Sequence, residues 1–87
     1  MSERISLNPG RVVHRVVDGE LMILDIDRSE YVRGNGSLAL VWPLIMRGCE
    51  LSEVVASLRE HYDVDRVEAT RSAESLCEDL RARGWID

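Results

Sequence analysis

Three stretches in the first third of the chain decide its fold: RVVHRVV at 11–17, GELMILDI at 19–26 and SEYVR at 29–33. Short runs rich in β-branched and apolar residues predict strands. Asp18-Gly19 between the first two runs is a strong signal for a two-residue hairpin turn, because both residue types accept positive φ. We therefore predict three antiparallel strands in simple meander order, over residues 12–17, 20–26 and 30–33.

The third of these strands carries the marks of a sheet edge. It is short and has charges at both ends, Glu30 and Arg33, which is how edge strands avoid indiscriminate pairing. An unpaired strand is also a place where another chain can bind. The second strand has apolar residues on both faces, and this hints at a second packing event with a partner.

Helical patterning begins at Asn35, and either Asn35 or Ser37 is expected to be the N-cap of a first helix. This helix, over 38–46, is apolar nearly all round and is therefore the central core helix. We expect Pro43 to kink it and Gly48 to end it.

Two further helices follow. The second is expected from its N-cap Ser52 to about residue 61, and the third from about Asp65 to 83, with Gly84 just past its end. Trp85 and Ile86 then fold back as a hydrophobic plug. The fold class is α+β: a three-stranded antiparallel sheet followed by three helices, compatible with a winged helix-turn-helix. Residues 1–10 are expected to be a flexible N-terminal tail, and 11–87 one domain.

Charge argues against nucleic acid and membrane as partners. The chain of 87 residues has 16 acidic residues against 11 basic ones, a net charge of −5, and every basic residue is arginine. A winged-helix regulator of transcription is the rival interpretation, but residues 65–83 hold five acids and four arginines, which repels a polyanion. The N-terminus has no apolar signal segment, so we expect a cytoplasmic protein.

The sequence carries no enzyme signature. It has no glycine-rich phosphate loop and no His-Glu-x-x-His motif, and Cys49 and Cys77 have no ligand partners at metal-site spacing. We expect both thiols to be buried and inert. The chain is predicted to have no catalytic residue, metal or cofactor.

Ala69 and Ala73 put small side chains in the middle of the apolar face of the third helix. Two interpretations remain open. They allow tight packing on the first helix, or they leave a shallow trough for another chain.

A set of spaced motifs resembles the PqqD-like family, the peptide-binding domains known as RiPP recognition elements. These motifs are GELMILDI (19–26), Tyr31, Asn35, Trp42, LSEVV (51–55), YDV (62–64) and LRARGWI (80–86). The chain looks most like the stand-alone leader-binding proteins of lasso-peptide biosynthesis. The peptide chaperones of pyrroloquinoline quinone synthesis are the close alternative.

The resemblance implies a function and a site. Such domains bind the leader segment of a ribosomally synthesised precursor peptide as an added strand and present it to a leader peptidase and, through the leader complex, to a cyclase. The leader would lie along the edge of the third strand and beside the third helix, with Arg33 and Arg71 available to leader carboxylates. The sequence does not tell which flank of the helix faces the strand. The implied peptide-binding residues are Glu30, Tyr31, Val32, Arg33, Val67, Thr70, Arg71, Glu74 and Leu76.

Two residues depart from the family pattern. Gly34 stands where a large apolar residue usually precedes the asparagine, and Pro43 stands where a helix former is usual. Both lie near the corner between the third strand and the first helix.

Overall fold

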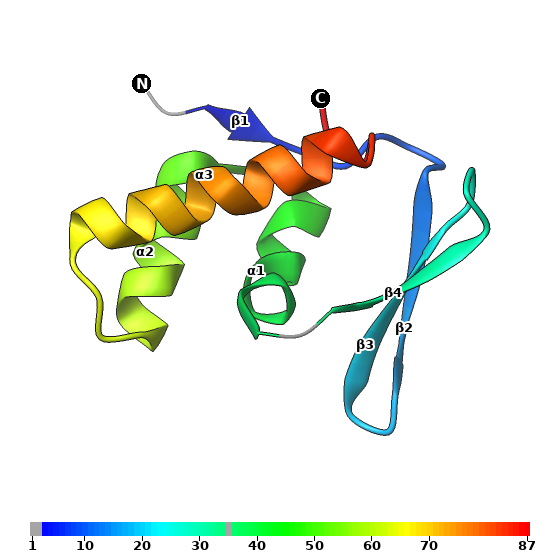
Figure 1. Ribbon diagram of the computed structural model, residues 1–87, viewed down its shortest axis with the longest axis horizontal. Helices are drawn as coiled ribbons and strands as arrows, with labels where there is room; N and C mark the ends of the chain where they lie inside the picture. The colour runs from blue at the N-terminus through cyan, green and yellow to red at the C-terminus, as the bar shows by residue number, and fades with distance from the viewer. Residues whose placement is uncertain (1–2, 35) are drawn as a thin grey trace.

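Two antiparallel sheets and three helices form the described part of the chain, residues 3–34 and 36–87 of a computed structural model (Figure 1). The three helices pack together at one end of the molecule, and the larger sheet forms the other end. The elements in chain order are β1 (Arg4–Ile5), β2 (Val12–Val17), β3 (Glu20–Asp25), β4 (Glu30–Gly34), α1 (Gly36–Arg47), β5 (Cys49–Glu50), α2 (Leu51–His61) and α3 (Arg66–Ala82).

The predicted meander is confirmed. The larger sheet has the order β2-β3-β4, all antiparallel, so β2 and β4 are its two edges. Asp18 and Gly19 have φ values of 52° and 79°, as a two-residue hairpin turn of type I′ requires. Ser29, with φ 51°, closes the second hairpin.

The tight first turn fixes which main-chain groups of β3 face which neighbour. Val17 and Glu20 are paired across it, so they form a hydrogen-bonded pair, and such pairs alternate along an antiparallel ladder. The even-numbered residues of β3 therefore direct their N–H and C=O groups toward β2, and the odd-numbered ones toward β4. In agreement with this alternation, the Ile26 N–H donates to the Arg11 carbonyl at 2.9 Å.

The N-terminal segment differs from the loose tail expected over 1–10. Ile5 is buried in the core and pairs with Cys49 in the small β1–β5 sheet. Leu7 forms a further bridge to Ile86. The apolar side chains of Ile5 and Leu7 hold this segment across the helices, although an isolated pair of such residues gives no strand signal in the sequence. Residues 1–2 lie outside the described part.

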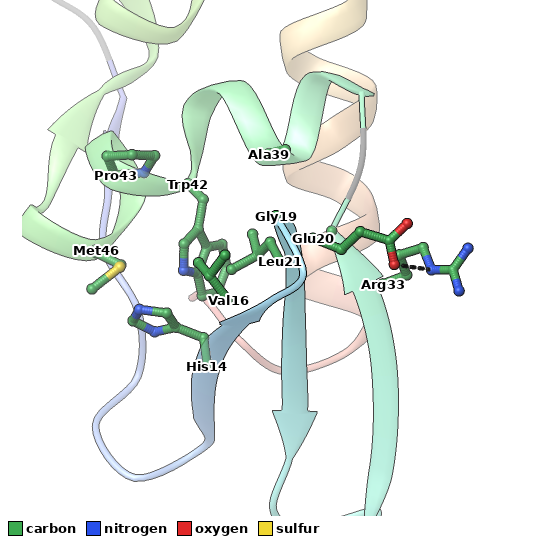
Figure 2. Close-up of a pocket in the computed structure, with 11 residues that line it drawn as sticks. His14, Val16, Gly19, Glu20, Leu21, Arg33, Ala39, Trp42, Pro43 and Met46 are labelled. Atoms are coloured by element: carbon green, nitrogen blue, oxygen red, sulfur yellow. Dashed lines mark ion pairs between the residues drawn. The ribbon is translucent and has the colours of Figure 1, made fainter.

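The core helix is confirmed, with a different start. It begins at Gly36, so Ser37 lies inside the helix and is not its N-cap, and Asn35 lies outside the described residues. The helix continues through Pro43, and Gly48, with φ 82°, follows its end. It lies over one face of the larger sheet, and its buried Trp42 projects toward that face (Figure 2).

The second helix is capped by Glu50, and the expectation of Ser52 at that position is wrong. Pairing with Arg4 holds Glu50 extended, and its N–H donates to the Glu53 carboxylate at 2.9 Å. This hydrogen bond, together with one from Arg47, lowers the pKa of Glu53. The helix therefore begins where β5 ends.

The third helix has the predicted ends. The Asp65 carboxylate accepts a hydrogen bond from the Glu68 N–H at 2.8 Å, and Gly84 follows the helix with φ 78°. Trp85 and Ile86 are buried, as expected of a C-terminal plug.

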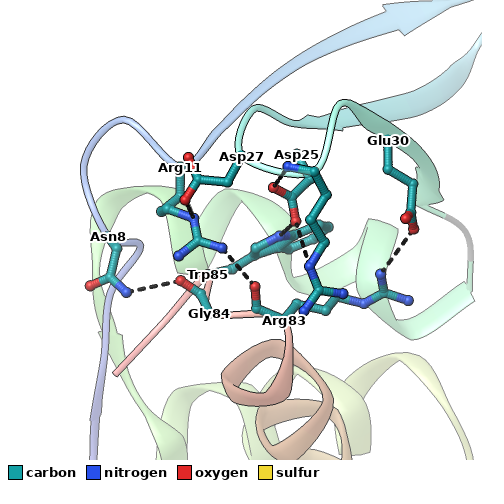
Figure 3. Close-up of polar contacts among 9 residues, drawn as sticks. Asn8, Arg11, Asp25, Asp27, Glu30, Arg83, Gly84 and Trp85 are labelled. Carbon is teal, nitrogen blue, oxygen red and sulfur yellow. Dashed lines mark hydrogen bonds and ion pairs between the residues drawn. The ribbon is translucent and has the colours of Figure 1, made fainter.

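A buried carboxylate joins this plug to the sheet (Figure 3). The indole N–H of Trp85 donates to Asp25 at the end of β3 over 2.9 Å, and the Arg28 N–H donates to the same carboxylate at 3.2 Å. The bond from Trp85 is the main reason that the pKa of Asp25 is lowered. Arg11 adds a second link, because its guanidinium donates to the Arg83 carbonyl at 3.0 Å. The end of α3 is thus fixed against the sheet.

Candidate functional site

The free edge of β4 offers unpaired main-chain groups. Because the odd-numbered residues of β3 face β4, their partners Glu30, Val32 and Gly34 have their N–H and C=O groups in the ladder. Tyr31 and Arg33 direct theirs away from the sheet. These two residues therefore supply the donors and acceptors that an added strand would use.

Two ion pairs show which flank of α3 faces this edge. Arg83, just past the helix, has its Nη1 3.9 Å from Glu30 Oε1 at the start of β4 (Figure 3). Arg81 pairs instead with Glu3 beside β1, at 2.6 Å, on the other flank. At about 100° per residue, the positions within about 60° of one another on the flank that includes Arg83 are Ser72, Leu76, Asp79 and Arg83.

An apolar hollow of about 300 Å³ lies at the far end of the same flank. Its walls come from the start of α1, the end of α2 and the side of α3, and Gly36 at its rim follows closely on β4. Glu30 at the start of β4 pairs with Arg83 at the end of α3, and Gly36, just after β4, lines the same hollow as Ser72 nearer the start of α3. β4 and α3 therefore run in roughly opposite directions. The hollow is lined by Gly36, Ser37, Leu58, Tyr62, Val64, Ala69 and Ser72.

The structure brings together only part of the predicted peptide-binding set. Glu30, Tyr31, Val32 and Arg33 form the edge, and Leu76 is on the same flank of α3 as Arg83, the partner of Glu30. The remaining four residues lie about 160° around α3, on the flank with Arg81. They line a separate shallow depression with Arg66 and do not meet β4; these four are Val67, Thr70, Arg71 and Glu74.

The space beside the small side chains of α3 is filled by another part of the same chain. Ala69 and Ala73 are fully buried, and α3 packs there against α2. Of the two interpretations left open, tight packing holds, with α2 as the main partner in place of the first helix.

Side chains able to carry chemistry are buried or scattered. Cys49 and Cys77 are free thiols with no exposed surface of note, and burial raises the pKa of both. Within residues 3–34 and 36–87, no three His, Cys, Asp or Glu side chains gather as a metal site would need. No helix of this part has the length and apolar character to cross a bilayer.

The family model of coenzyme PQQ synthesis protein D (PqqD) matches residues 20–86. The chain belongs to the PqqD family. The resemblance predicted from the motifs is therefore confirmed. No curated protein matches the chain.

Two solved structures share the fold of this PqqD-family chain. One, described as TbiB1 in complex with the TbiA(beta) leader peptide, has a TM-score of 0.82 at 20% identity, over 95% of each chain. The other, lasso peptide synthetase B1 complexed with the leader peptide, has a TM-score of 0.80 at 26% identity, over 99% of each chain. The predicted α+β fold is confirmed. The family match begins at β3, so β1 and β2 lie outside it.

Proposed function

We propose that this chain binds the leader segment of a ribosomally synthesised precursor peptide, of the lasso type, by strand addition to β4. The observation that carries the proposal is the free edge of β4, which begins beside the end of α3 and leads toward the apolar hollow. The main-chain groups of Tyr31 and Arg33 that face away from the sheet lie along this edge. Two proteins of the same fold are complexes with leader peptides, and one of them is described as a lasso peptide synthetase component.

The geometry predicts how the leader is read. Leader residues that pair with Tyr31 and Arg33 put their side chains on the outer face of the sheet, because directly opposed residues share a face. The leader residues between them point inward, toward Leu76 and the α3 flank. Main-chain bonds would set the register, and side-chain contacts would set the choice of peptide.

The hollow beyond the end of β4 is suited to an apolar anchor of the leader. Leu58, Tyr62 and Val64 give it an apolar wall, and a volume of about 300 Å³ suits one large side chain. A buried anchor in a preformed pocket typically dominates the affinity of such contacts. Arg33 forms an exposed ion pair with Glu20 at 3.6 Å and could exchange this partner for a leader carboxylate at the edge. Arg71 is on the remote flank of α3.

The chain would act as an adaptor and not as a catalyst. By holding the leader it raises the local concentration of precursor at its partner enzymes, the leader peptidase and, through the leader complex, the cyclase. This work requires neither cofactor nor metal, and we place it in the cytoplasm.

Calorimetric titration with synthetic leaders tests the proposal. We expect dissociation constants in the micromolar range or below for one lasso-type leader encoded beside this gene. Ser72→Tyr places a ring in the hollow from an exposed position, and we expect binding to weaken at least about tenfold. Ser75→Tyr, on the solvent face of the same helix, is the matched control and should leave the affinity unchanged.

Absence of binding to any neighbouring leader would reject the proposal. Preference for the precursor peptide of the quinone pathway would instead identify the chain as a chaperone of that pathway. Equal effects of the two serine variants would show that the leader does not use this hollow.

A further inference from the structure

A second and larger hollow, of about 560 Å³, lies between α1 and one end of the larger sheet and reaches from the β2 edge to Gly34 of β4 (Figure 2). It opens between α1 and the face of the sheet that carries Val16 and Leu21, with Pro43 and Met46 on the helix side. Val16 is 68% exposed and Met46 47% exposed, which is unusual for apolar side chains that flank a core helix. None of the predicted leader contacts except Arg33 reaches it.

The indole N–H of Trp42 is a second, independent indication that this hollow binds a ligand. Its side chain is only 3% exposed, and its indole N–H has no acceptor within the described residues. The other tryptophan, Trp85, has its N–H paired with Asp25. Buried donors are nearly always paired in folded proteins, so an unpaired one at a pocket wall points to a missing acceptor. His14, an exposed side chain whose ring meets the indole edge-on at 5.9 Å, lies beside Trp42 at the mouth of the hollow (Figure 2).

The rim of the hollow is a free strand edge. Even-numbered residues of β3 bond to the odd-numbered residues of β2, so Val12, His14 and Val16 direct their N–H and C=O groups away from the sheet. A strand added here would place alternate side chains beside His14 and Val16, at the mouth of the hollow. Its uncharged main chain would also bring carbonyl acceptors close to Trp42.

The charges around the hollow limit the kind of segment that could bind in it. The charged residues in the lining are Glu20 and Arg33, which pair with each other at 3.6 Å, so the hollow favours an uncharged segment. A second copy of this chain is a poor candidate, because each copy has a net charge of −5 and symmetric pairing of β2 would set the two His14 side chains together.

We propose that the β2 edge and this hollow form a second docking site, which takes an extended, apolar segment of the enzyme that acts on the bound leader. The segment would pair with β2, insert one apolar side chain, and offer a carbonyl oxygen to the Trp42 N–H. The proposal rests on the proposed function, since an adaptor must hold peptide and enzyme together. The leader would lie on β4, at the opposite edge of the same sheet, and the hollow meets that edge at Arg33 and Gly34.

The test is to titrate the purified leader peptidase of the same pathway into the preformed complex of this chain with its leader. Val16→Glu puts a charge at the mouth of the hollow and should weaken peptidase binding more than about 30-fold. Val13→Glu, at an exposed position on the other face of the same strand, is the matched control and should have no effect. Trp42→Phe removes the donor together with part of the ring and should weaken peptidase binding about 5- to 10-fold, with its fold checked by urea denaturation.

Three results would overturn the proposal: peptidase binding that stays at the wild-type value in Val16→Glu, binding that Val16→Glu and Val13→Glu weaken to the same extent, or a dimer of this chain that Val16→Glu abolishes. Leader affinity, measured in the same variants without peptidase, separates the two ideas. It should stay at the wild-type value in all three variants. If the wild-type chain binds no leader, the proposed function fails, whereas a normal leader affinity with an unaffected peptidase rejects only the second site.

Discussion

Proline substitutions along β4 test the strand addition directly, because neighbouring residues have opposite roles. The Tyr31 N–H points to the free edge, whereas the Val32 N–H bonds to Ile23 inside the ladder. Tyr31→Pro should therefore leave the sheet intact and remove a donor from the leader. Proline is tolerated in edge strands where its missing N–H faces solvent.

The expected loss of affinity follows from one hydrogen bond. A net protein hydrogen bond contributes about 0.5–1.5 kcal/mol, and a leader carbonyl left unpaired beside the proline ring costs about 1–3 kcal/mol. A combined loss of about 2–3 kcal/mol corresponds to about 30- to 150-fold weaker leader binding. Tyr31→Ala, which removes the exposed ring and keeps the N–H, is the matched control and should lose far less.

Val32→Pro should behave in the opposite way. It removes a ladder hydrogen bond and leaves the buried Ile23 carbonyl without its donor, at a combined cost of about 2–4 kcal/mol. This is a large part of the roughly 4–13 kcal/mol expected for a domain of this size. Urea denaturation of all three variants separates folding from binding. The register argument is wrong if Tyr31→Pro binds leader as well as Tyr31→Ala, or if Val32→Pro is as stable as the wild type.

Three further predictions concern stability and the thiols. Gly34→Ala should destabilise the fold by about 1–2 kcal/mol in urea denaturation, because the new Cβ would lie 2.5 Å from Leu21 Cδ2; Leu21→Val should recover part of the loss, and wild-type stability in the single variant would contradict the crowding. Asp25 has a lowered pKa in the folded chain, so its carboxylate stabilises the fold above the unfolded pKa of about 3.9, and this contribution is lost as the pH falls through the folded pKa. Melting temperatures between about pH 2 and pH 6 should accordingly depend less on pH in Asp25→Asn, and identical profiles would rule this out. Cys49 and Cys77 should react with a thiol reagent only after unfolding, and rapid labelling of the folded chain would refute their burial.

Features of the fold that depend on neighbouring residues were predictable from the sequence. The Asp18-Gly19 turn, the Asp65 cap and the glycine after α3 are each decided by the local conformational preferences of one or two residues. The pairing of Ile5 with Cys49 is a contact between distant segments, and no local pattern announces it. Because this small sheet holds Glu50 extended, α2 is capped by Glu50 and not by the predicted Ser52.

The candidate site was predictable to the level of its elements. The edge strand follows from strand order, but the flank of α3 that meets it depends on how the helix rolls against α2. The ion pairs of Arg83 with Glu30 and of Arg81 with Glu3 indicate how α3 is rotated about its own axis. The unpaired N–H of Trp42 likewise becomes apparent only when every possible acceptor around it is known.

The departure at Gly34 does not weaken the case for leader binding. Position 34 faces the core side of the sheet, opposite Leu21 in the register, and the Leu21 side chain fills the space that a side chain at 34 would occupy. The large apolar residue at this corner is therefore supplied by β3 in place of β4. Because Gly34 keeps its main-chain groups in the ladder, Tyr31 and Arg33 still face outward, and the edge that reads the leader keeps its alternation. The usual residue at this position thus matters for packing volume, and a glycine there is compatible with the same edge as long as its neighbour across the ladder is large.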